Sequence, residues 1–349
     1  RKNAAKKSGG SAYFDQILDK LNVETCLANR AFMAPYLDPQ RFHWVFFGDS
    51  FFFPFDNRDQ TASTPDMGVY IPLQEKMLAR YKQQMNGRGI NLEPAKAKDA
   101  LPENLAGYEA FVRNTMADNQ KRGGVAIKFE AAYFRTLYFG DPPRDEAEAI
   151  YNKYRSGGVP STEEYRTFQD YIFRVMVDQA GKLTLPMHFH TAVGIGDYFS
   201  LRQGHVLNLE NVLRDPRYHN TTFVLVHGGW PYEKEAALLT AVKNVYLDTS
   251  FQSELLYPSQ FKDVLKQLLT LFPDKMMYGS DAFPFNDALG AEESFWLAAH
   301  TTRTALAAAL AELVSERAIT QDKALELARL YLHDNAAKLY GSGSTGGKK

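Results

Sequence analysis

Three short apolar runs end in side chains that are common metal ligands: Leu185-Pro-Met-His-Phe-His190, Phe223-Val-Leu-Val-His227 and Met276-Met-Tyr-Gly-Ser-Asp281. Runs of this length, bounded by turn residues, predict buried β-strands. His190, His227 and Asp281 then all lie at the C-terminal end of a strand. Because parallel strand ends meet on one rim, where an α/β barrel has its active site, we expect the three side chains to lie together.

Strands and helices alternate along the rest of the chain. Four further runs predict strands, at 23–28, 43–48, 124–128 and 244–250. Helices are expected between them, at 12–21, 69–86, 93–99, 103–121, 144–155, 161–180, 208–214, 232–243, 258–272, 290–315 and 320–338. This alternation predicts a parallel sheet, either open and doubly wound or closed as a barrel. No G-x-G-x-x-G motif follows the first strand, which argues against a dinucleotide fold.

The fold class that we predict is α/β, a TIM-like (β/α)8 barrel whose first strand is missing from the sequence. That strand should precede the helix at 12–21, yet residues 1–11 are polar. Residues 1–11 and 341–349 are rich in Gly, Ser and Lys and are expected to be tails. The sequence thus predicts one barrel domain at 12–340.

Composition limits the classes of partner. The chain has 349 residues, of which 45% are hydrophobic, enough for a large core. Forty basic and 41 acidic side chains give a net charge of −1, so we expect neither nucleic acid nor a membrane as a partner. The only cysteine is Cys26, so a metal would need histidine and carboxylate ligands. The single cysteine and the lack of a hydrophobic region after the basic start predict a cytoplasmic protein.

Several segments resemble the amidohydrolase superfamily, in particular its amidohydrolase 2 branch and the amidohydrolase-like domain fused to some glutamine-synthetase-like proteins. The residues that carry the resemblance are 126–135, 185–197, 226–235, 244–250, 278–284 and 334–341. They occur in the family's order, and the resemblance covers about 20–340. It implies a metal-dependent TIM-barrel enzyme.

One family feature is absent. The family has a His-x-His pair on its first strand, whereas the only such pair here, His188 and His190, lies on a later strand. Either the sequence lacks N-terminal residues or the protein has lost two ligands. We favour the first interpretation, because an incomplete barrel leaves sheet edges unpaired.

Roles follow for the three strand-end residues. His190 and His227 would bind or orient a divalent ion, expected to be zinc, with manganese or iron as alternatives. Asp281 would be a ligand, or the general base that takes a proton from the metal-bound water. Alternatively, the histidines are ordinary buried residues and Asp281 caps a helix.

Four further residues are expected to bind substrate. Lys128 ends an apolar strand and would hold a carboxylate; it could also be carboxylated between two metals, or pair with Glu130. Arg135 could hold a carboxylate or be a solvated surface residue. His188 would donate toward the substrate or simply pack. Trp230 lies in the loop after His227.

The expected function is metal-dependent hydrolysis of a small molecule that carries a carboxylate. A non-oxidative decarboxylase of the same family is an alternative. Another is a catalytically silent barrel with a regulatory or assembly role. The expected partner is a small-molecule substrate, and a homodimer is left open. The sequence does not identify the substrate, because barrel specificity resides in loops.

Overall fold

The computed structural model describes residues 6, 8, 9, 11–33, 37–85, 101–286 and 288–341. A sheet of seven parallel strands forms its centre, and the strands follow one another in sequence order. They are β1 (Cys26–Asn29), β2 (Phe42–Phe47), β3 (Gly124–Phe129), β4 (Met187–His190), β5 (Phe223–Val226), β6 (Val245–Asp248) and β7 (Met276–Met277). The predicted parallel α/β architecture is confirmed, with each strand near its expected position.

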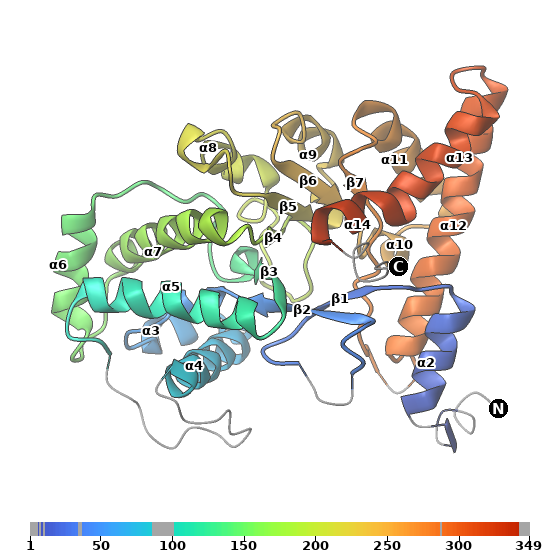
Figure 1. Ribbon diagram of the computed structural model, residues 1–349. Helices are drawn as coiled ribbons and strands as arrows, with labels where there is room; N and C mark the ends of the chain where they lie inside the picture. The colour runs from blue at the N-terminus through green and yellow to red at the C-terminus, as the bar shows by residue number, and fades with distance from the viewer. Residues whose placement is uncertain are drawn as a thin grey trace, which may run out of the picture.

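Helices connect the strands and pack around the sheet (Figure 1). They are α2 (Ser11–Lys20), α3 (Arg58–Thr61), α4 (Pro65–Met85), α5 (Leu105–Lys121), α6 (Arg144–Tyr154), α7 (Thr162–Leu183), α8 (Glu210–Leu213), α9 (Glu233–Leu239), α10 (Gln252–Leu255), α11 (Pro258–Leu271), α12 (Ala291–Ser315), α13 (Gln321–Arg329) and α14 (Asn335–Tyr340). The predicted helix at 320–338 is interrupted by a π-turn, η6 (Leu330–Asp334). The predicted helix at 93–99 and most of the two predicted tails lie outside the described residues.

Helix α7 fixes the neighbouring strands β3 and β4. It begins at a capping box, in which Ser161 and Glu164 satisfy each other's backbone N–H groups. Its Phe173 ring lies 5.6 Å from Phe129 of β3 and 5.8 Å from Phe189 of β4. All three rings are fully buried. The strands pair so that Lys128 is opposite His188, which places both side chains on the same face of the sheet.

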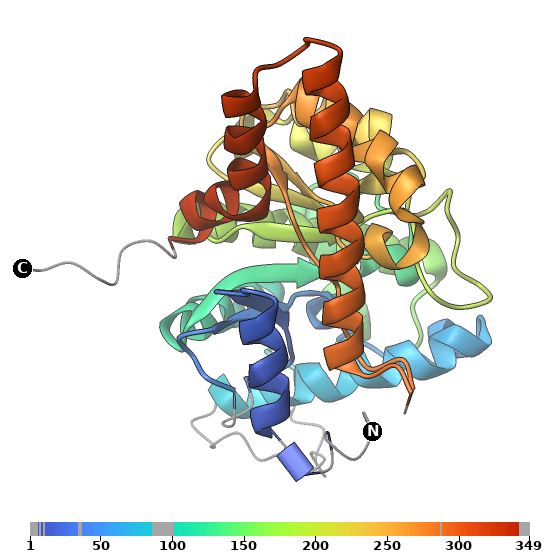
Figure 2. The same ribbon diagram turned by 90° about the vertical axis from the view of Figure 1, so that its right-hand side faces the viewer.

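The sheet does not close on itself within the described residues. β1 pairs only with β2, and β7 pairs only with β6, so the sheet is one strand short of a closed barrel. Helices α2 and α12 lie side by side across this open side (Figure 2). The Phe14 and Phe295 rings are 5.7 Å apart there, and Arg303 donates to the carbonyl of Leu21. Helix packing thus joins the two edges where strand pairing does not.

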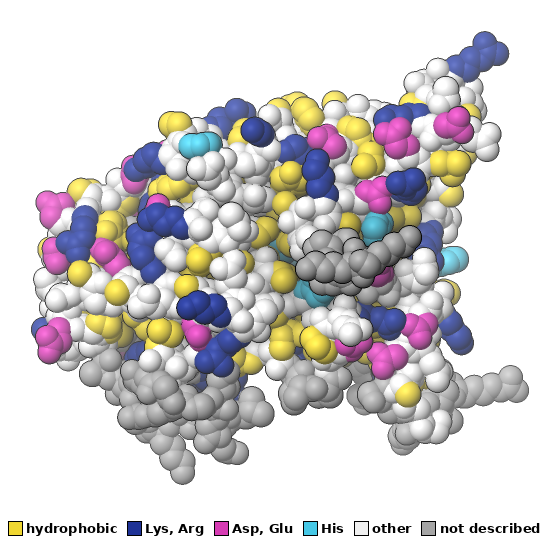
Figure 3. Space-filling view, viewed as in Figure 1, with side chains coloured by type: hydrophobic (Ala, Val, Ile, Leu, Met, Phe, Trp, Pro, Cys, Tyr) yellow, Lys and Arg dark blue, Asp and Glu magenta, His cyan; other side chains and the backbone are white. Residues whose placement is uncertain are grey.

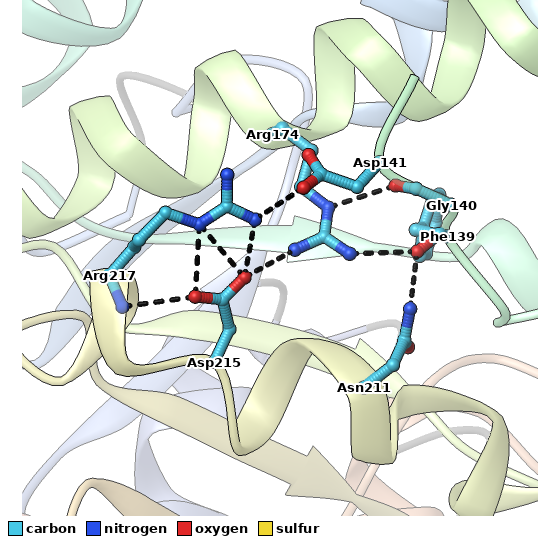
Figure 4. Close-up of polar contacts among 7 residues, drawn as sticks. All are labelled: Phe139, Gly140, Asp141, Arg174, Asn211, Asp215 and Arg217. Carbon is cyan, nitrogen blue, oxygen red and sulfur yellow. Dashed lines mark hydrogen bonds and ion pairs between the residues drawn. The ribbon is translucent and has the colours of Figure 1, made fainter. Parts of the chain in front are cut away.

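An arginine cluster ties the loop after β3 to α7 and to the turn before β5 (Figure 4). Arg174 donates to the carbonyls of Phe139 and Gly140 and pairs with Asp215 at 3.0 Å. Arg217 joins Asp215 to Asp141. Every charge in the cluster has an opposite partner, so its role is to hold these segments together.

The surface carries charges of both signs. Acidic and basic side chains are interspersed over the face shown in Figure 3, in keeping with a net charge of −1. Among the described residues, no helix combines the length and the apolar character needed to span a bilayer.

Candidate active site

A cavity of about 1010 Å³ lies at the C-terminal ends of the strands. Five strands each place a polar side chain in its wall: Lys128, His190, His227, Ser250 and Asp281. The prediction that His190, His227 and Asp281 lie together at one end of a parallel sheet is therefore confirmed. The cavity continues between β1 and β7, where residues 21–30 and 277–284 line it.

The backbone brings His190 and His227 together. His190 is the last residue of β4 and is in register with Val226 of β5, so His227 follows one position later. Thr191 reinforces this arrangement, because its hydroxyl donates to the Val226 carbonyl at 2.6 Å. The chain turns sharply at His227, whose φ is 69°. The following Gly228 has no room for a side chain, since a Cβ there would lie 2.6 Å from the Gln252 amide nitrogen.

The two imidazoles face each other in a buried setting. His227 Nε2 lies 3.0 Å from His190 Nδ1. Burial lowers the pKa of His227 to about 3, helped by the Lys128 charge, and holds the pKa of His190 well below its usual range. Both rings are therefore neutral near pH 7, and each keeps one nitrogen lone pair for a ligand. The outer nitrogen of His190, Nε2, is buried without a hydrogen-bond partner.

Two polar residues at and just after the end of β6, Asp248 and Ser250, contact His227 on the side away from His190. Ser250 Oγ lies 3.0 Å from His227 Nδ1 and 2.5 Å from Asp248 Oδ1. Asp248 Oδ1 also accepts the backbone N–H of His227 at 3.2 Å. Both residues lie in the strand predicted at 244–250, and neither was among the predicted site residues. The spacing Asp248-x-Ser250 at a strand end was the available signal.

Asp281 follows β7 and lines the same cavity. Its φ is 56°, in the left-handed region that is uncommon for residues other than glycine. Burial raises the pKa of Asp281 to about 7; the Lys128 charge lowers it, while the Asp248 and Glu130 carboxylates raise it. A carboxyl with a pKa near 7 can both accept and release a proton at neutral pH. Strained backbone of this kind concentrates at functional sites, and it also occurs at His227.

Lys128 is 1% exposed and lines the cavity. In the part of the chain that the structure describes, its ammonium has no carboxylate within 4.0 Å, so the alternative of an ion pair with Glu130 is not observed. The backbone N–H of Glu130 donates to the Asp49 carboxylate at 2.7 Å. A buried ammonium without an ion pair is costly, and an anionic ligand would compensate it.

The remaining predicted residues divide into two groups. His188 lines the cavity at a deeper level, where its Nε2 lies 2.6 Å from the Tyr340 hydroxyl. Arg135 and Trp230 are not among the residues that line it. Arg135 is buried in an ion pair with Asp170 at 2.5 Å and also donates to Gln169. Its contacts are those of a structural residue.

An aromatic residue that was not predicted covers His190. The Tyr133 ring centre is 4.6 Å from that of His190. The Tyr133 hydroxyl accepts the N–H of Ile195, from the loop after β4. Tyr133 therefore shields the histidine pair from solvent and holds this loop beside the cavity.

The histidine pair has the spacing to bind one metal ion. Two nitrogens on one tetrahedral ion would lie about 3.3 Å apart, close to the observed 3.0 Å. Asp281 lines the cavity but does not join them, since the described residues contain no group of three His, Cys, Asp or Glu side chains in ligand positions.

A curved parallel sheet with histidines and an aspartate at its C-terminal strand ends is the arrangement of a TIM-barrel enzyme, whose active site lies at that rim. The family model Amidohydro_2, described as Amidohydrolase, matches residues 82–342. The chain belongs to this amidohydrolase family, as its strand motifs suggested.

Individual relatives are more distant. Protein fluG of Emericella nidulans is 27% identical over 189 residues, which are 52% of this chain and 21% of that protein. The chain thus spans about a fifth of that relative's length. A protein assigned as a metal-dependent hydrolase from Lactobacillus casei is similar in structure, with a TM-score of 0.70, 19% identity and coverage of 96% of this chain and 77% of that one.

A second solved structure supports the fold. Uronate isomerase from Thermotoga maritima has a TM-score of 0.66 at 12% identity and covers 93% of this chain and 69% of its own. At these identities, the two structural matches establish the barrel fold alone.

Proposed function

We propose that this chain is a metal-dependent hydrolase of a small molecule that carries a carboxylate. One observation carries the proposal: His190 and His227 face each other at 3.0 Å, in the same cavity as Asp281 and the buried Lys128. Two neutral nitrogens, a carboxyl with a raised pKa and a buried cation are the groups that such a reaction needs.

Each residue has a distinct role in the proposal. His190 and His227 would hold the ion, and a bound zinc ion would lower the pKa of a coordinated water to about 7. Asp281 would accept the proton of the attacking water, because its own pKa is about 7. Lys128 would hold the substrate carboxylate, and Tyr133 would exclude bulk solvent from the histidine side.

Isomerisation of a uronate is a second candidate. Two of the similar structures are a uronate isomerase and a glucuronate isomerase, and the latter, from Caulobacter crescentus, has a TM-score of 0.63. Uronates carry a carboxylate, which suits the buried Lys128. In this reaction Asp281 would move a proton within the substrate rather than take one from water.

The test combines metal content with turnover. The purified chain is loaded with Zn²⁺ or Mn²⁺ and assayed on carboxylate-bearing amides, esters and lactones, and on uronates. We expect one bound ion and turnover of one class, with kcat lowered at least about 100-fold in Asp281→Asn and metal retained. Asp274→Asn, at an exposed turn before β7, is the matched control.

Two results would contradict the proposal. Absence of both metal and turnover would favour the catalytically silent barrel. Full activity in Asp281→Asn would leave that carboxyl without a role in the chemistry.

A further inference from the structure

The hydrogen bonds around Asp248 determine which atom donates in each step of a hydrogen-bond network that ends at the histidine pair. Asp248 Oδ1 accepts the backbone N–H groups of His227 at 3.2 Å and of Ser250 at 2.9 Å. Backbone N–H groups can only donate, so this oxygen carries no proton. The third contact to it, from Ser250 Oγ at 2.5 Å, must therefore use the hydrogen of the serine hydroxyl.

That assignment determines the proton on His227. The Ser250 hydroxyl has a single hydrogen, already donated to Asp248, so toward His227 Nδ1 its oxygen can only accept. The backbone carbonyl of Ser250, 3.2 Å from the same nitrogen, is also an acceptor. Two acceptors at one ring nitrogen require that nitrogen to carry the hydrogen. In the neutral ring, Nε2 of His227 is then a lone pair that points at His190.

We infer that Asp248 and Ser250 are positioning residues that hold His227 in the Nδ1–H tautomer and so present its Nε2 lone pair to the cavity. Neither residue touches a reacting atom in this assignment; both act through His227. The inference deepens the proposed function, because this is the tautomer that can bind a metal ion through Nε2.

The same reasoning extends to His190 in the metal-free protein. Its Nδ1 faces a lone pair at 3.0 Å and must donate, so its Nε2 is also a lone pair. That nitrogen is buried without a partner. The metal-free pair thus leaves one acceptor, Nε2 of His190, without a donor, and an ion held between the two rings would take the place of the hydrogen on Nδ1.

The first experiment needs no metal and no substrate. The chain is labelled with ¹⁵N-histidine and kept at pH 8 with a chelator, and ring tautomers are measured by long-range ¹H–¹⁵N correlation, with His227→Gln used to assign the signals. We expect the hydrogen of His227 on Nδ1. In Ser250→Ala we expect an increased Nε2–H population, because one of the two acceptors is gone. Ser250→Thr, which keeps a hydroxyl, should restore the wild-type spectrum.

The second experiment measures the affinity of the same variants for Zn²⁺ alone. Removal of a residue that orients a metal-bound histidine typically weakens binding by about 10–100-fold, so Ser250→Ala should do so and Ser250→Thr should not. Asp248→Asn, which keeps an acceptor oxygen, guards against a misfolded serine variant and should retain the Nδ1–H tautomer.

The two measurements separate the inference from the proposed function. An Nδ1–H tautomer in a protein that binds no Zn²⁺ supports the inference and counts against the metal site. A wild-type His227 with its hydrogen on Nε2, or a Ser250→Ala variant with unchanged tautomer and Zn²⁺ affinity, would overturn the inference even if the protein is an active enzyme.

Discussion

Replacement of Lys128 by methionine should affect stability and ligand binding in opposite directions. Lys128 is 1% exposed, and no carboxylate of the described residues lies within ion-pair distance of it. Burial of the ammonium costs free energy of folding, and we expect the carboxylates of Asp49, Glu130 and Asp281, which lie beyond ion-pair distance, to offset only part of it. Methionine fills a similar volume without charge. We expect Lys128→Met to raise the free energy of unfolding of the ligand-free protein by about 1–3 kcal/mol.

Binding of a carboxylate should weaken in the same variant. Two unit charges 4 Å apart attract by about 4 kcal/mol near a protein surface, and desolvation offsets part of this. A net loss of about 2–3 kcal/mol corresponds to a Kd or KM raised about 30- to 150-fold. Asp281 and the histidines keep their side chains, so Zn²⁺ content at a saturating concentration of Zn²⁺ should not change.

Urea unfolding and isothermal titration with glucuronate and other small carboxylates measure the two effects. Lys121→Met, at the exposed end of α5, is the matched control and should change neither. A Lys128→Met protein that is destabilised by more than about 2 kcal/mol would show that the ammonium stabilises the fold and would refute the reasoning. Unchanged carboxylate binding would refute it as well.

Three further predictions concern the neighbouring charges. Burial raises the pKa of Asp281 to about 7, so the folded state binds this proton more tightly than the unfolded state does. The free energy of unfolding should therefore fall as the pH rises from about 4 to about 7. Asp281→Asn has no such proton to lose, so its free energy of unfolding relative to the wild type should be about 1–3 kcal/mol higher at pH 8 than at pH 4. Urea unfolding with a chelator measures this difference, and a difference that does not change with pH would contradict the prediction. A cation bound in the same cavity favours the charged form of Asp281, so Zn²⁺ affinity in equilibrium dialysis should fall by up to about tenfold per pH unit below pH 7, with a flatter slope in Asp281→Asn. Arg135→Met leaves Asp170 buried without its partner and should cost about 3–5 kcal/mol of stability with Zn²⁺ affinity unchanged, and a variant as stable as the wild type would point to a role other than structural.

The sequence predicted the features that depend on local pattern. Each strand-end residue follows an apolar run, and a parallel sheet brings such ends together, so His190, His227 and Asp281 were placed in one cavity correctly. Strand and helix positions also follow local periodicity, and they agree with the structure to within a few residues at most ends.

Features that depend on distant partners could not be predicted. Arg135 was expected at the substrate, yet its partner Asp170 lies 35 residues away on α7, and no local pattern reveals that pair. Ser250 and Asp248 matter because both face His227, which depends on how β5 and β6 pair. The packing of α2 against α12 across the open side of the sheet likewise joins segments from opposite ends of the chain.

The central claim is that the histidine pair holds a metal ion, and anomalous diffraction from crystals grown with Zn²⁺ tests it most directly. The account predicts a peak about 2.0–2.1 Å from Nε2 of His227 and within the same distance of a nitrogen of His190, absent from crystals of the His190→Ala, His227→Ala double variant. A strong peak away from both rings, or none at a saturating concentration of Zn²⁺, would contradict it.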